Sequence, residues 1–572
     1  MSTNINWNST VALRLAQAFA RHGVELTFGQ SLPSAFHLAS PHAGIRQMPY
    51  RQENSGGAMA DGYARISRKV GVVTAQNGPA ATLLVAPLAE ALKASVPVIA
   101  LVQEVDRSTT DKNAFQELDH IKLFDGVAKF VRRIERADRL EDYVDMAFTA
   151  ATSGRPGPAV LMVAPDLLME KGPALSPRKS NLGTFPLNRT VADPEAVARA
   201  AALIAEARAP LIVAGGGIHL SDASAELAAL QESAHIPVAT TVMGKGSVDE
   251  NHLLSLGCVG NFMAPGSRTH GMRSLVDDAD VMVLIGNRTN QNGTDNWKLY
   301  PPAARYIHID VDPMEIGRNY EALRLQGDAK LTIAALSRAL SGLDLSFRKT
   351  RRAQVETQIK AAVDDWRSKI AAISTRLDGP VRPEQLMAEV EKRMKPTDIA
   401  VADASYSSTW ITNFLTSHRP GQRFLTPRGL AGLGWGVPMA IGAKIAAPES
   451  RVICVAGDGG FAHNWAELET VRRLGTPIII LMLNNGILGY QTHAEDLKFG
   501  EHTNACDFTD VDHAGIARCC GLNARRVSTG SEVQKALDEA FASDTASFIE
   551  VITDPEARPP YTIFADHFRE MF

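Results

Sequence analysis

The sequence lacks an apolar run long enough to cross a bilayer. Hydrophobic residues make up 45% of its 572 positions, but no continuous stretch reaches the roughly 18 apolar residues that a membrane span needs. The first residues, MSTNINWNSTVALRLAQAF, also lack the basic segment and apolar segment of a secretory signal. We therefore expect a cytoplasmic protein that has no membrane partner.

Strong net charge is missing as well. The formal net charge is only -4, which gives no electrostatic reason to expect a nucleic-acid partner. The five cysteines, at positions 258, 454, 506, 519 and 520, form neither a metal-ligand spacing nor an even set for disulfides. The adjacent Cys519 and Cys520 are interpreted as reduced helix positions, which favours a reducing compartment.

Short β-branched runs alternate with helical periodicity along the whole chain, and no low-complexity tract interrupts them. This alternation is typical of parallel sheets wrapped by helices, and a chain of this length exceeds one hydrophobic core. The polar stretch 178–194 indicates a linker, and the charged stretch 343–378 a helical connector. We predict an α/β fold of three doubly wound parallel-sheet domains, with boundaries at 1–178, 192–342 and 379–572.

The segment GDGGFAHNWAELETVRRLGTPIIILMLNNG, residues 457 to 486, carries the clearest chemical signal. Two buried strands are predicted, before Gly457 and before Asn485, so both polar ends fall at the carboxyl edge of one sheet, where α/β folds bind ligands. Gly457 and Gly459 allow close approach to an anion at a helix N-terminus. Asp458, Asn485 and the Ile487 carbonyl are oxygen ligands of the type that Mg²⁺ takes beside a bound phosphate. The alternative is that Asp458 caps a helix and the asparagines form a turn.

This pairing of Gly-Asp-Gly with Asn-Asn resembles the thiamin diphosphate (ThDP) motif of the ThDP-dependent enzymes. The segments RQENSGGAMADGYAR (51–65), TDKNAFQELD (110–119), GRPGPAVLMV, HIDVDPMEIGRN and GLAGLGWGVPMAIGAK (429–444) are similar to the acetolactate synthase branch. The resemblance implies a pyrimidine-binding domain, a central Rossmann-like domain and a diphosphate-binding domain, in that order. It also implies ThDP and Mg²⁺ as cofactors.

The resemblance implies roles for individual residues as well. Glu53 matches the glutamate that hydrogen-bonds the cofactor's pyrimidine ring, and burial is expected to raise its pKa; the alternative is a glutamate that favours a helix start. Leu433 matches the apolar residue that holds the cofactor bent, and Ala431 falls where a backbone carbonyl takes its amine. The expected cofactor-binding set is Glu53, Asn77, Gly78, Ala431, Leu433, Gly457, Asp458, Gly459, Gly460, Asn485, Ile487 and Leu488.

A second group of residues matches the substrate channel of the synthases. Phe115 and Gln116 correspond to a pair that lines the channel, and Lys129 to a lysine of its wall. Together with Glu53 they form the expected catalytic set, although each of the three also suits an ordinary surface position. The histidines at 120, 493 and 567 lie near these segments, and lone histidines are more often structural than catalytic.

Several positions depart from the synthase pattern. Ala494 stands where biosynthetic synthases carry a tryptophan that selects the acceptor, and Tyr490 and Gln491 replace apolar residues. The segment CVGNFMAPGSRTHG lacks the regular flavin-contacting pattern. The glycine-rich turn 213–217 is a weak nucleotide signal by itself. FAD, an ADP or CoA moiety, and no ligand at all therefore remain three alternatives for the central domain.

The predicted activity is decarboxylation of a 2-oxo acid, with pyruvate as the expected donor, followed by carboligation to a second carbonyl compound. The alternatives are a ThDP-dependent 2-oxo-acid decarboxylase, a 2-hydroxyacyl-CoA lyase, an acetyltransferase, and, from another class, a non-catalytic nucleotide-binding or regulatory partner. The resemblance implies a homodimer or homotetramer in which the pyrimidine half of each site meets the diphosphate half of a neighbouring chain.

Overall fold

The structure, a computed structural model, describes residues 5–174, 176–375 and 380–565. The chain divides into two compact units, which we call unit 1 and unit 2. Unit 1 contains Met1–Asn188, Pro427–Glu449 and Asn464–Ile478, and unit 2 contains Arg189–Thr426, Ser450–His463 and Ile479–Phe572. The predicted domain boundaries stay predictions, because these units divide the chain differently.

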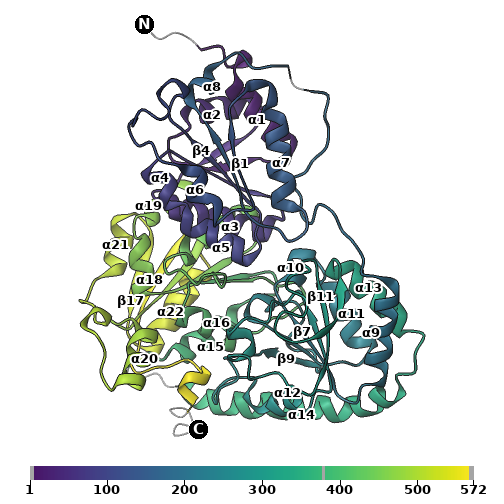
Figure 1. The fold of residues 1–572 in the computed structure, drawn as a ribbon. Coiled ribbons are helices and arrows are strands. Elements are labelled where there is room, and N and C mark those ends of the chain that lie inside the picture. The colour runs from purple at the N-terminus through teal and green to yellow at the C-terminus, as the bar shows by residue number, and fades with distance from the viewer. Residues whose placement is uncertain (1–4, 175, 376–379, 566–572) are drawn as a thin grey trace. The chain divides into compact units, whose positions relative to one another are not determined.

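Unit 1 is built on a six-stranded sheet with the order β2-β1-β3-β4-β6-β5. Every pair of neighbouring strands is parallel, and helices lie against the sheet (Figure 1). β3 and β4 are almost wholly buried, and their burial on both faces explains why they carry no polar alternation. The strands are β1 (Leu26–Phe28), β2 (Arg46–Met48), β3 (Gly71–Ala75), β4 (Val98–Gln103), β5 (Phe130–Ile134) and β6 (Ala159–Val163).

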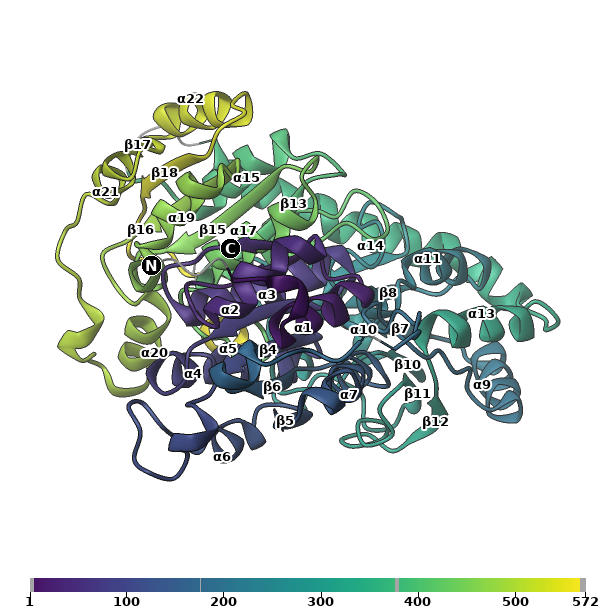
Figure 2. The ribbon, with the colours of Figure 1, turned by 90° about the horizontal axis from the view of Figure 1, so that it is seen from above.

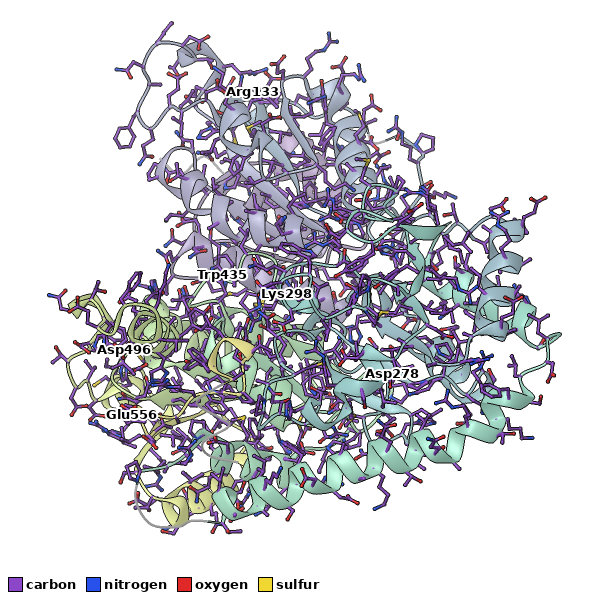
Figure 3. The ribbon with its side chains drawn as sticks, turned by 60° about the horizontal axis from the view of Figure 1, so that its bottom comes forward. Arg133, Asp278, Lys298, Trp435, Asp496 and Glu556 are labelled. Carbon is purple, nitrogen blue, oxygen red and sulfur yellow. The ribbon has the colours of Figure 1, made fainter. Side chains whose placement is uncertain are left out.

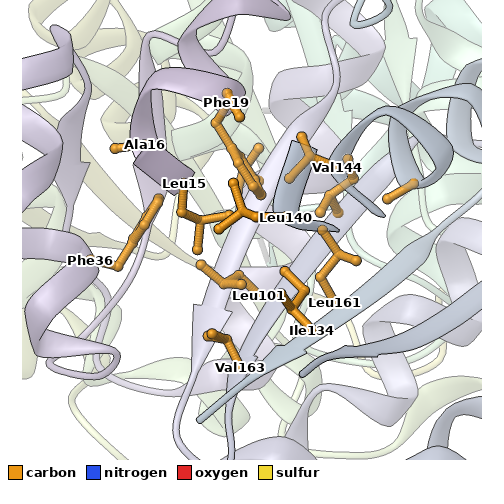
Figure 4. Packing of buried hydrophobic residues seen from close by; sticks show 14 of the residues in the cluster. Leu15, Ala16, Phe19, Phe36, Leu101, Ile134, Leu140, Val144, Leu161 and Val163 are labelled. Atoms are coloured by element: carbon orange, nitrogen blue, oxygen red, sulfur yellow. The ribbon is translucent and has the colours of Figure 1, made fainter. Parts of the chain in front are cut away.

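One face of this sheet is covered by α1 (Val11–Arg21) and α7 (Leu140–Thr152). Phe19 of α1 meets Phe36 and Phe148 edge to face, with ring centroids 5.8 and 5.5 Å apart. Figure 4 shows Phe19, Leu101 and Leu161 in the same apolar cluster between helix and sheet. In Figure 2, α7 lies beside β5 and β6, which it contacts.

Two glycine-containing helices of unit 1, α3 (Glu53–Ser67) and α17 (Gly436–Ala446), pack closely against each other. A Cβ at Gly62 would lie 2.3 Å from the Met439 carbonyl oxygen, and one at Gly442 would lie 2.0 Å from the Met59 carbonyl oxygen. Glycine is therefore required at both positions, because any larger residue would separate the helices. Packing explains the small residues of two segments that carried the family resemblance.

Unit 2 contains two further six-stranded parallel sheets, with the orders β12-β11-β10-β7-β8-β9 and β14-β13-β15-β16-β18-β17. When the strands of this last sheet are numbered from its own first strand, their order is the same as in the sheet of unit 1, so the two sheets share one topology. The α/β fold with three parallel sheets is thereby confirmed. The strands are β7 (Pro210–Ala214), β8 (Val238–Thr240), β9 (Ser255–Cys258), β10 (Val281–Ile285), β11 (Arg305–Asp310), β12 (Ala322–Gln326), β13 (Ile399–Ala402), β14 (Phe424–Leu425), β15 (Val452–Gly457), β16 (Ile478–Asn484), β17 (Asn523–Val527) and β18 (Ser547–Ile552).

The predicted connector after the second sheet is a single helix of 29 residues, α14 (Ser346–Ser374). None of the helices in the described ranges combines the length and the apolar character that a membrane crossing requires. The remaining helices are α2 (Ser34–Ala39), α4 (Pro79–Leu83), α5 (Val85–Ala94), α6 (His120–Asp125), α8 (Pro165–Met169), α9 (Pro194–Glu206), α10 (Gly217–Ser221), α11 (Ser224–Ser233), α12 (Arg273–Asp277), α13 (Ala329–Leu340), α15 (Pro383–Arg393), α16 (Tyr406–Phe414), α18 (Asp458–Phe461), α19 (Glu467–Leu474), α20 (Gly489–Phe499), α21 (His513–Cys519) and α22 (Gly530–Phe541).

Candidate active site

The Asp458 carboxylate is buried at the carboxyl end of β15, where only 5% of the residue is exposed. One of its oxygens accepts a hydrogen bond from the Gly459 amide at 2.9 Å, and the other accepts one from the Gly486 amide at 2.8 Å. Burial raises the pKa of Asp458 to about 6, although both amides lower it, and the Glu550 charge raises it further. A buried carboxylate of this kind is a favourable place for a cation.

Two glycines beside Asp458 face open space. A Cβ at Gly457 would meet only the Ser407 hydroxyl, at 3.8 Å, and one at Gly486 would meet nothing within 4 Å. Gly486 also has a φ of +71°, which favours glycine. This part of the sheet edge therefore has room for a ligand, and the predicted role of Gly457 in ligand binding stays a prediction. Gly459 differs, because a Cβ there would lie 2.8 Å from Leu488 Cδ2, so a larger residue would have to displace the Leu488 side chain.

The helical stretch after Asp458 is broken into pieces. The sequence predicts one helix between the two polar ends, whereas the structure has α18 with four residues, a 3-10 turn at Ala462–Asn464, and then α19. Gly460 is buried inside α18. The anion-binding contribution expected from a long helix at this point is therefore reduced, because so short a helix has only a weak dipole.

The loop after β16 carries the other predicted metal ligands. The side-chain oxygen Oδ1 of Asn485 accepts a hydrogen bond from the Ile487 amide at 3.4 Å, so the asparagine side chain folds back over its own loop. The Leu488 amide donates to the Cys506 carbonyl at 2.8 Å, and Ile487 forms a bridge with Asp507. Within the described residues no cluster of three or more His, Cys, Asp or Glu side chains forms a metal site. A metal at this edge would thus need a mixed set of ligands.

Sequence reasoning missed the loop that precedes α16. Ser405 adopts φ +62° and ψ -139°, a conformation that a residue with a side chain rarely takes. The hydroxyl of Ser407 lies beside Gly457, and the ring of Tyr406 lies 3.2 Å from where a Cβ on Gly489 would be. The strained backbone thus brings this loop to the edge that holds Asp458. Only the unusual dihedral angles reveal it, and the residue types DASYSS give no such signal.

Tyr406 also connects this edge to the C-terminal segment. Its hydroxyl lies 2.9 Å from His493 Nδ1, and His493 Nε2 lies 3.0 Å from the Pro555 carbonyl oxygen. Because a carbonyl only accepts, Nε2 carries the proton and Tyr406 donates to Nδ1. Phe564 packs on the same rings. His493 is therefore structural here, and His567 lies outside the described residues.

Glu53 begins α3 in unit 1, as expected from the sequence. It is 9% exposed, and burial raises the pKa of its carboxyl. The neighbouring Asn54 accepts a hydrogen bond from the Trp435 indole N–H at 2.8 Å. Glu53 thus sits in a dry position that favours the protonated form, next to a residue that contacts the predicted cofactor loop.

The loop with Ala431 and Leu433 is anchored at both ends within unit 1. The Glu90 carboxylate accepts hydrogen bonds from the Gly429 amide at 2.8 Å and the Leu430 amide at 2.5 Å, and Trp435 anchors the other end. Ala431 has a φ of +63°, which a residue with a side chain rarely adopts, so the loop is strained there. Leu433 is 36% exposed, so its side chain is accessible to a ligand.

Asn77, Gly78 and Gln116 lie together after β3. The Asn77 amide group donates to the carbonyl oxygens of Phe115 and Gln116, at 3.3 and 3.1 Å. A Cβ at Gly78 would lie 2.7 Å from the Gln116 carbonyl oxygen. The Phe115 side chain, by contrast, is 85% exposed. Three of the predicted residues therefore form one compact wall, and Phe115 projects from it.

Lys129 has a structural position. Its ammonium donates to the Ser153 and Arg155 carbonyl oxygens, at 3.1 and 2.6 Å, and also to Ala150, all at the C-terminal end of α7. A cation at this end of a helix is stabilised by the unpaired carbonyls and by the helix dipole. Its predicted place in the channel wall stays a prediction.

The glycines of the central domain have a packing explanation. A Cβ at Gly215 would lie 2.2 Å from the Gly286 carbonyl oxygen, and one at Gly217 would lie 2.6 Å from the Gly286 Cα. The ends of β7 and β10 thus touch each other through glycine backbone. Since packing alone requires these glycines, they add no support for a nucleotide, and flavin binding stays a prediction.

Comparison with known proteins places the chain in a family. The N-terminal TPP binding domain of the thiamine pyrophosphate enzymes matches residues 9–123, their central domain matches 197–336, and their C-terminal TPP binding domain matches 403–551. The chain belongs to the thiamine pyrophosphate (ThDP) enzymes.

Within this family the chain falls in the acetolactate synthase branch. It is 33% identical to the probable acetolactate synthase large subunit of Methanococcus aeolicus over 569 residues, which are 95% of this chain and 92% of that protein. It is 33% identical to the corresponding protein of Methanocaldococcus jannaschii over 567 residues, again 95% and 92%. The acetolactate synthase isozyme 2 large subunit of Escherichia coli (strain K12) is 29% identical over 558 residues, 94% of this chain and 95% of that protein.

The Glu90 anchor yields a first prediction. Glu90 is 2% exposed and also pairs with Arg65 at 3.3 Å. Glu90→Ala should destabilise the protein by about 2–4 kcal/mol, because two loop amides lose their acceptor, while Arg65 keeps Asp61 as a buried partner. It should also speed hydrogen exchange in residues 427–435. Urea unfolding and hydrogen-exchange mass spectrometry measure the two effects.

Glu25→Ala serves as the matched control. Glu25 pairs with Lys69 at 2.7 Å in the same unit, but its side chain is 65% exposed, so its loss should cost about 0–1 kcal/mol. Equal effects of the two substitutions would show that Glu90 does not anchor the loop.

Proposed function

We propose that the protein is a ThDP- and Mg²⁺-dependent carboligase of the acetolactate synthase type. It decarboxylates a 2-oxo acid, with pyruvate as the donor, and joins the remaining two-carbon fragment to a second carbonyl compound. The observation that carries the proposal is the buried Asp458 carboxylate, which lies beside open glycine backbone in a chain whose relatives are named acetolactate synthases.

The residues at the unit 2 sheet edge suit Mg²⁺ and a diphosphate. Asp458 supplies a carboxylate, and Asn485 and Ile487 supply carbonyl oxygens, which are hard ligands that a divalent cation prefers. Gly457 and Gly486 leave the space that a phosphate group needs. In the proposed holoenzyme these residues hold the metal, and the metal in turn holds the diphosphate.

Thiamin diphosphate, when bound, supplies a nucleophilic carbon and an electron sink for decarboxylation. The chain supplies a carboxyl group that hydrogen-bonds the cofactor, residues that orient the cofactor and the substrate, and a site shielded from water. Glu53, with its raised pKa, holds a proton at its carboxyl where the family places the pyrimidine ring. Leu433 holds the cofactor's shape, Asn77 and Gly78 face the cofactor, and Gln116 lines the substrate channel.

We also propose that the protein is a homo-oligomer, either a dimer or a tetramer, with each site completed by a second chain. Four large apolar side chains of unit 1 are exposed beside predicted site residues in the sequence: Phe115 85%, Leu118 42% and Ile121 42%, around Gln116, and Leu430 51%, next to Ala431. Exposed apolar groups that lie together mark interaction surfaces. A second copy of the chain is the expected cover, as the family resemblance implies.

Product analysis tests the proposed function directly. Purified protein is given ThDP, Mg²⁺ and pyruvate, with and without 2-oxobutyrate, after its absorption has been recorded in the flavin region. Acetolactate formation with CO2 release is expected. Acetaldehyde as the only organic product would instead establish a decarboxylase, and an absence of pyruvate turnover despite saturable ThDP binding would overturn the choice of substrate.

The second prediction concerns Glu53. Glu53→Gln keeps the size and polarity of the side chain but cannot exchange a proton, so kcat should fall about 10²- to 10⁴-fold, the usual contribution of a positioned acid or base. ThDP affinity should change little. Steady-state kinetics and ThDP titration measure both quantities, and near-normal turnover would remove Glu53 from the mechanism.

The third prediction concerns metal removal. Chelation of Mg²⁺ should weaken ThDP binding by about 100-fold or more, because a buried charge would lose its partner. Asp458→Ala should cause a similar loss, and chelator should then have little further effect. Calorimetric ThDP titrations measure the affinities.

The control for this prediction is Asp544→Ala, at an exposed aspartate of the same unit. It should bind ThDP as the unmodified protein does and should keep the full sensitivity to chelator. If the Asp458 variant also kept that sensitivity, another residue would hold the metal.

A further inference from the structure

A buried carboxylate–histidine pair supports the wall that Asn77, Gly78 and Gln116 form in unit 1. His120 is 0% exposed and Glu104 is 5% exposed. His120 Nδ1 lies 3.2 Å from a Glu104 carboxylate oxygen, and His120 Nε2 accepts the Gly78 amide hydrogen at 2.9 Å. The other Glu104 oxygen accepts a hydrogen bond from Arg133 at 3.3 Å. Arg133 is labelled in Figure 3.

The protonation of His120 follows from these contacts. The Gly78 amide can only donate, so His120 Nε2 must be an unprotonated acceptor. The proton then lies on Nδ1 and is donated to Glu104, which holds the imidazole in this tautomer. His120 is therefore occupied on both nitrogens, and it holds the backbone of Gly78 rather than a substrate atom.

The turn that His120 holds lies against a strained backbone at Gln116. Gly78 has a φ of +62°, which glycine adopts without strain, whereas Gln116 has the same φ although a residue with a side chain rarely adopts it. Asn77 donates to the Gln116 carbonyl, and the Gln76 side-chain amide donates to the Gln116 side-chain oxygen. The two loops are thus joined, and a strained conformation persists only where its surroundings fix it.

We propose that Glu104 and His120 are positioning residues, which fix the Asn77–Gly78 turn and, through it, Gln116 in the geometry needed for the substrate. The inference rests on the proposed function, because that function makes Gln116 part of the lining of the substrate channel. Neither residue touches the substrate. Their effect is on orientation, and a misplacement of about 1 Å can cost about 100-fold in rate.

The same chemical arrangement occurs a second time in unit 1 and provides a matched control. His22 is 2% exposed, its Nε2 lies 2.9 Å from Asp145, and its Nδ1 accepts the Leu182 amide hydrogen at 3.1 Å. His22 lies between α1 and β1, at the amino edge of the sheet, whereas Gly78 and Glu104 follow β3 and β4 at the carboxyl edge. Only the His120 arrangement touches predicted site residues.

The test compares His120→Leu, His120→Gln and His22→Leu. His120→Leu removes the acceptor, so kcat/KM for pyruvate should fall about tenfold or more. His120→Gln keeps an acceptor for Gly78 and a donor for Glu104, so it should recover most of the activity. His22→Leu should lower the thermal midpoint but leave the kcat/KM of the folded protein near that of the unmodified chain.

Hydrogen exchange of the peptide containing residues 76–82 gives a measurement that does not depend on turnover. Exchange there should speed up in His120→Leu and stay unchanged in His22→Leu. The proposal is overturned if folded His120→Leu keeps normal kcat/KM, if both leucine variants lose activity equally, or if exchange is unaltered. If the unmodified protein does not turn over pyruvate, the proposed substrate fails, and the exchange result alone decides whether His120 fixes the turn.

Discussion

The burial of the Asp458 carboxylate is the constraint on which the diphosphate half of the site depends. Taking a carboxylate out of water costs free energy unless hydrogen bonds or a cation compensate. Two backbone amides compensate in part, yet the pKa still rises to about 6. A cation bound at this edge of the parallel sheet would therefore stabilise the Asp458 carboxylate, and the neighbouring glycine backbone faces open space.

Unit 1 also contains a buried carboxyl group, that of Glu53, but the role proposed for it differs from that of Asp458. Burial also raises the pKa of Glu53, and in the role proposed for Glu53 the protonated carboxyl is the useful state, because it can donate a hydrogen bond. Two carboxyl groups of one chain are therefore suited to different tasks by their surroundings. One would bind a cation, and the other would hold a proton.

The sequence was most informative where one chemical group and its spacing carry the function. Asp458 and Asn485 follow two apolar runs, so the sheet edge could be predicted, as could the three parallel sheets. The contacts that support the site were not predictable in this way. Glu90 and Gly429 lie 339 positions apart, and the role of Glu104 and His120 depends on a turn that only folding brings to them. The strained backbone at Ser405 could not be predicted, because serine is an ordinary residue type for such a loop. The helix predicted after Asp458 is interrupted in the structure.

Mixing of inactive variants tests most directly whether the two carboxyl groups belong to one site supplied by two chains. Glu53→Gln and Asp458→Ala protein are each purified, mixed under conditions that allow subunit exchange, and assayed for ThDP-dependent turnover. The account predicts that activity reappears on mixing, because some sites then combine an intact Glu53 from one chain with an intact Asp458 from the other. Demonstrated subunit exchange without any recovery of activity would contradict it, since Glu53 and Asp458 would then have to act within the same chain.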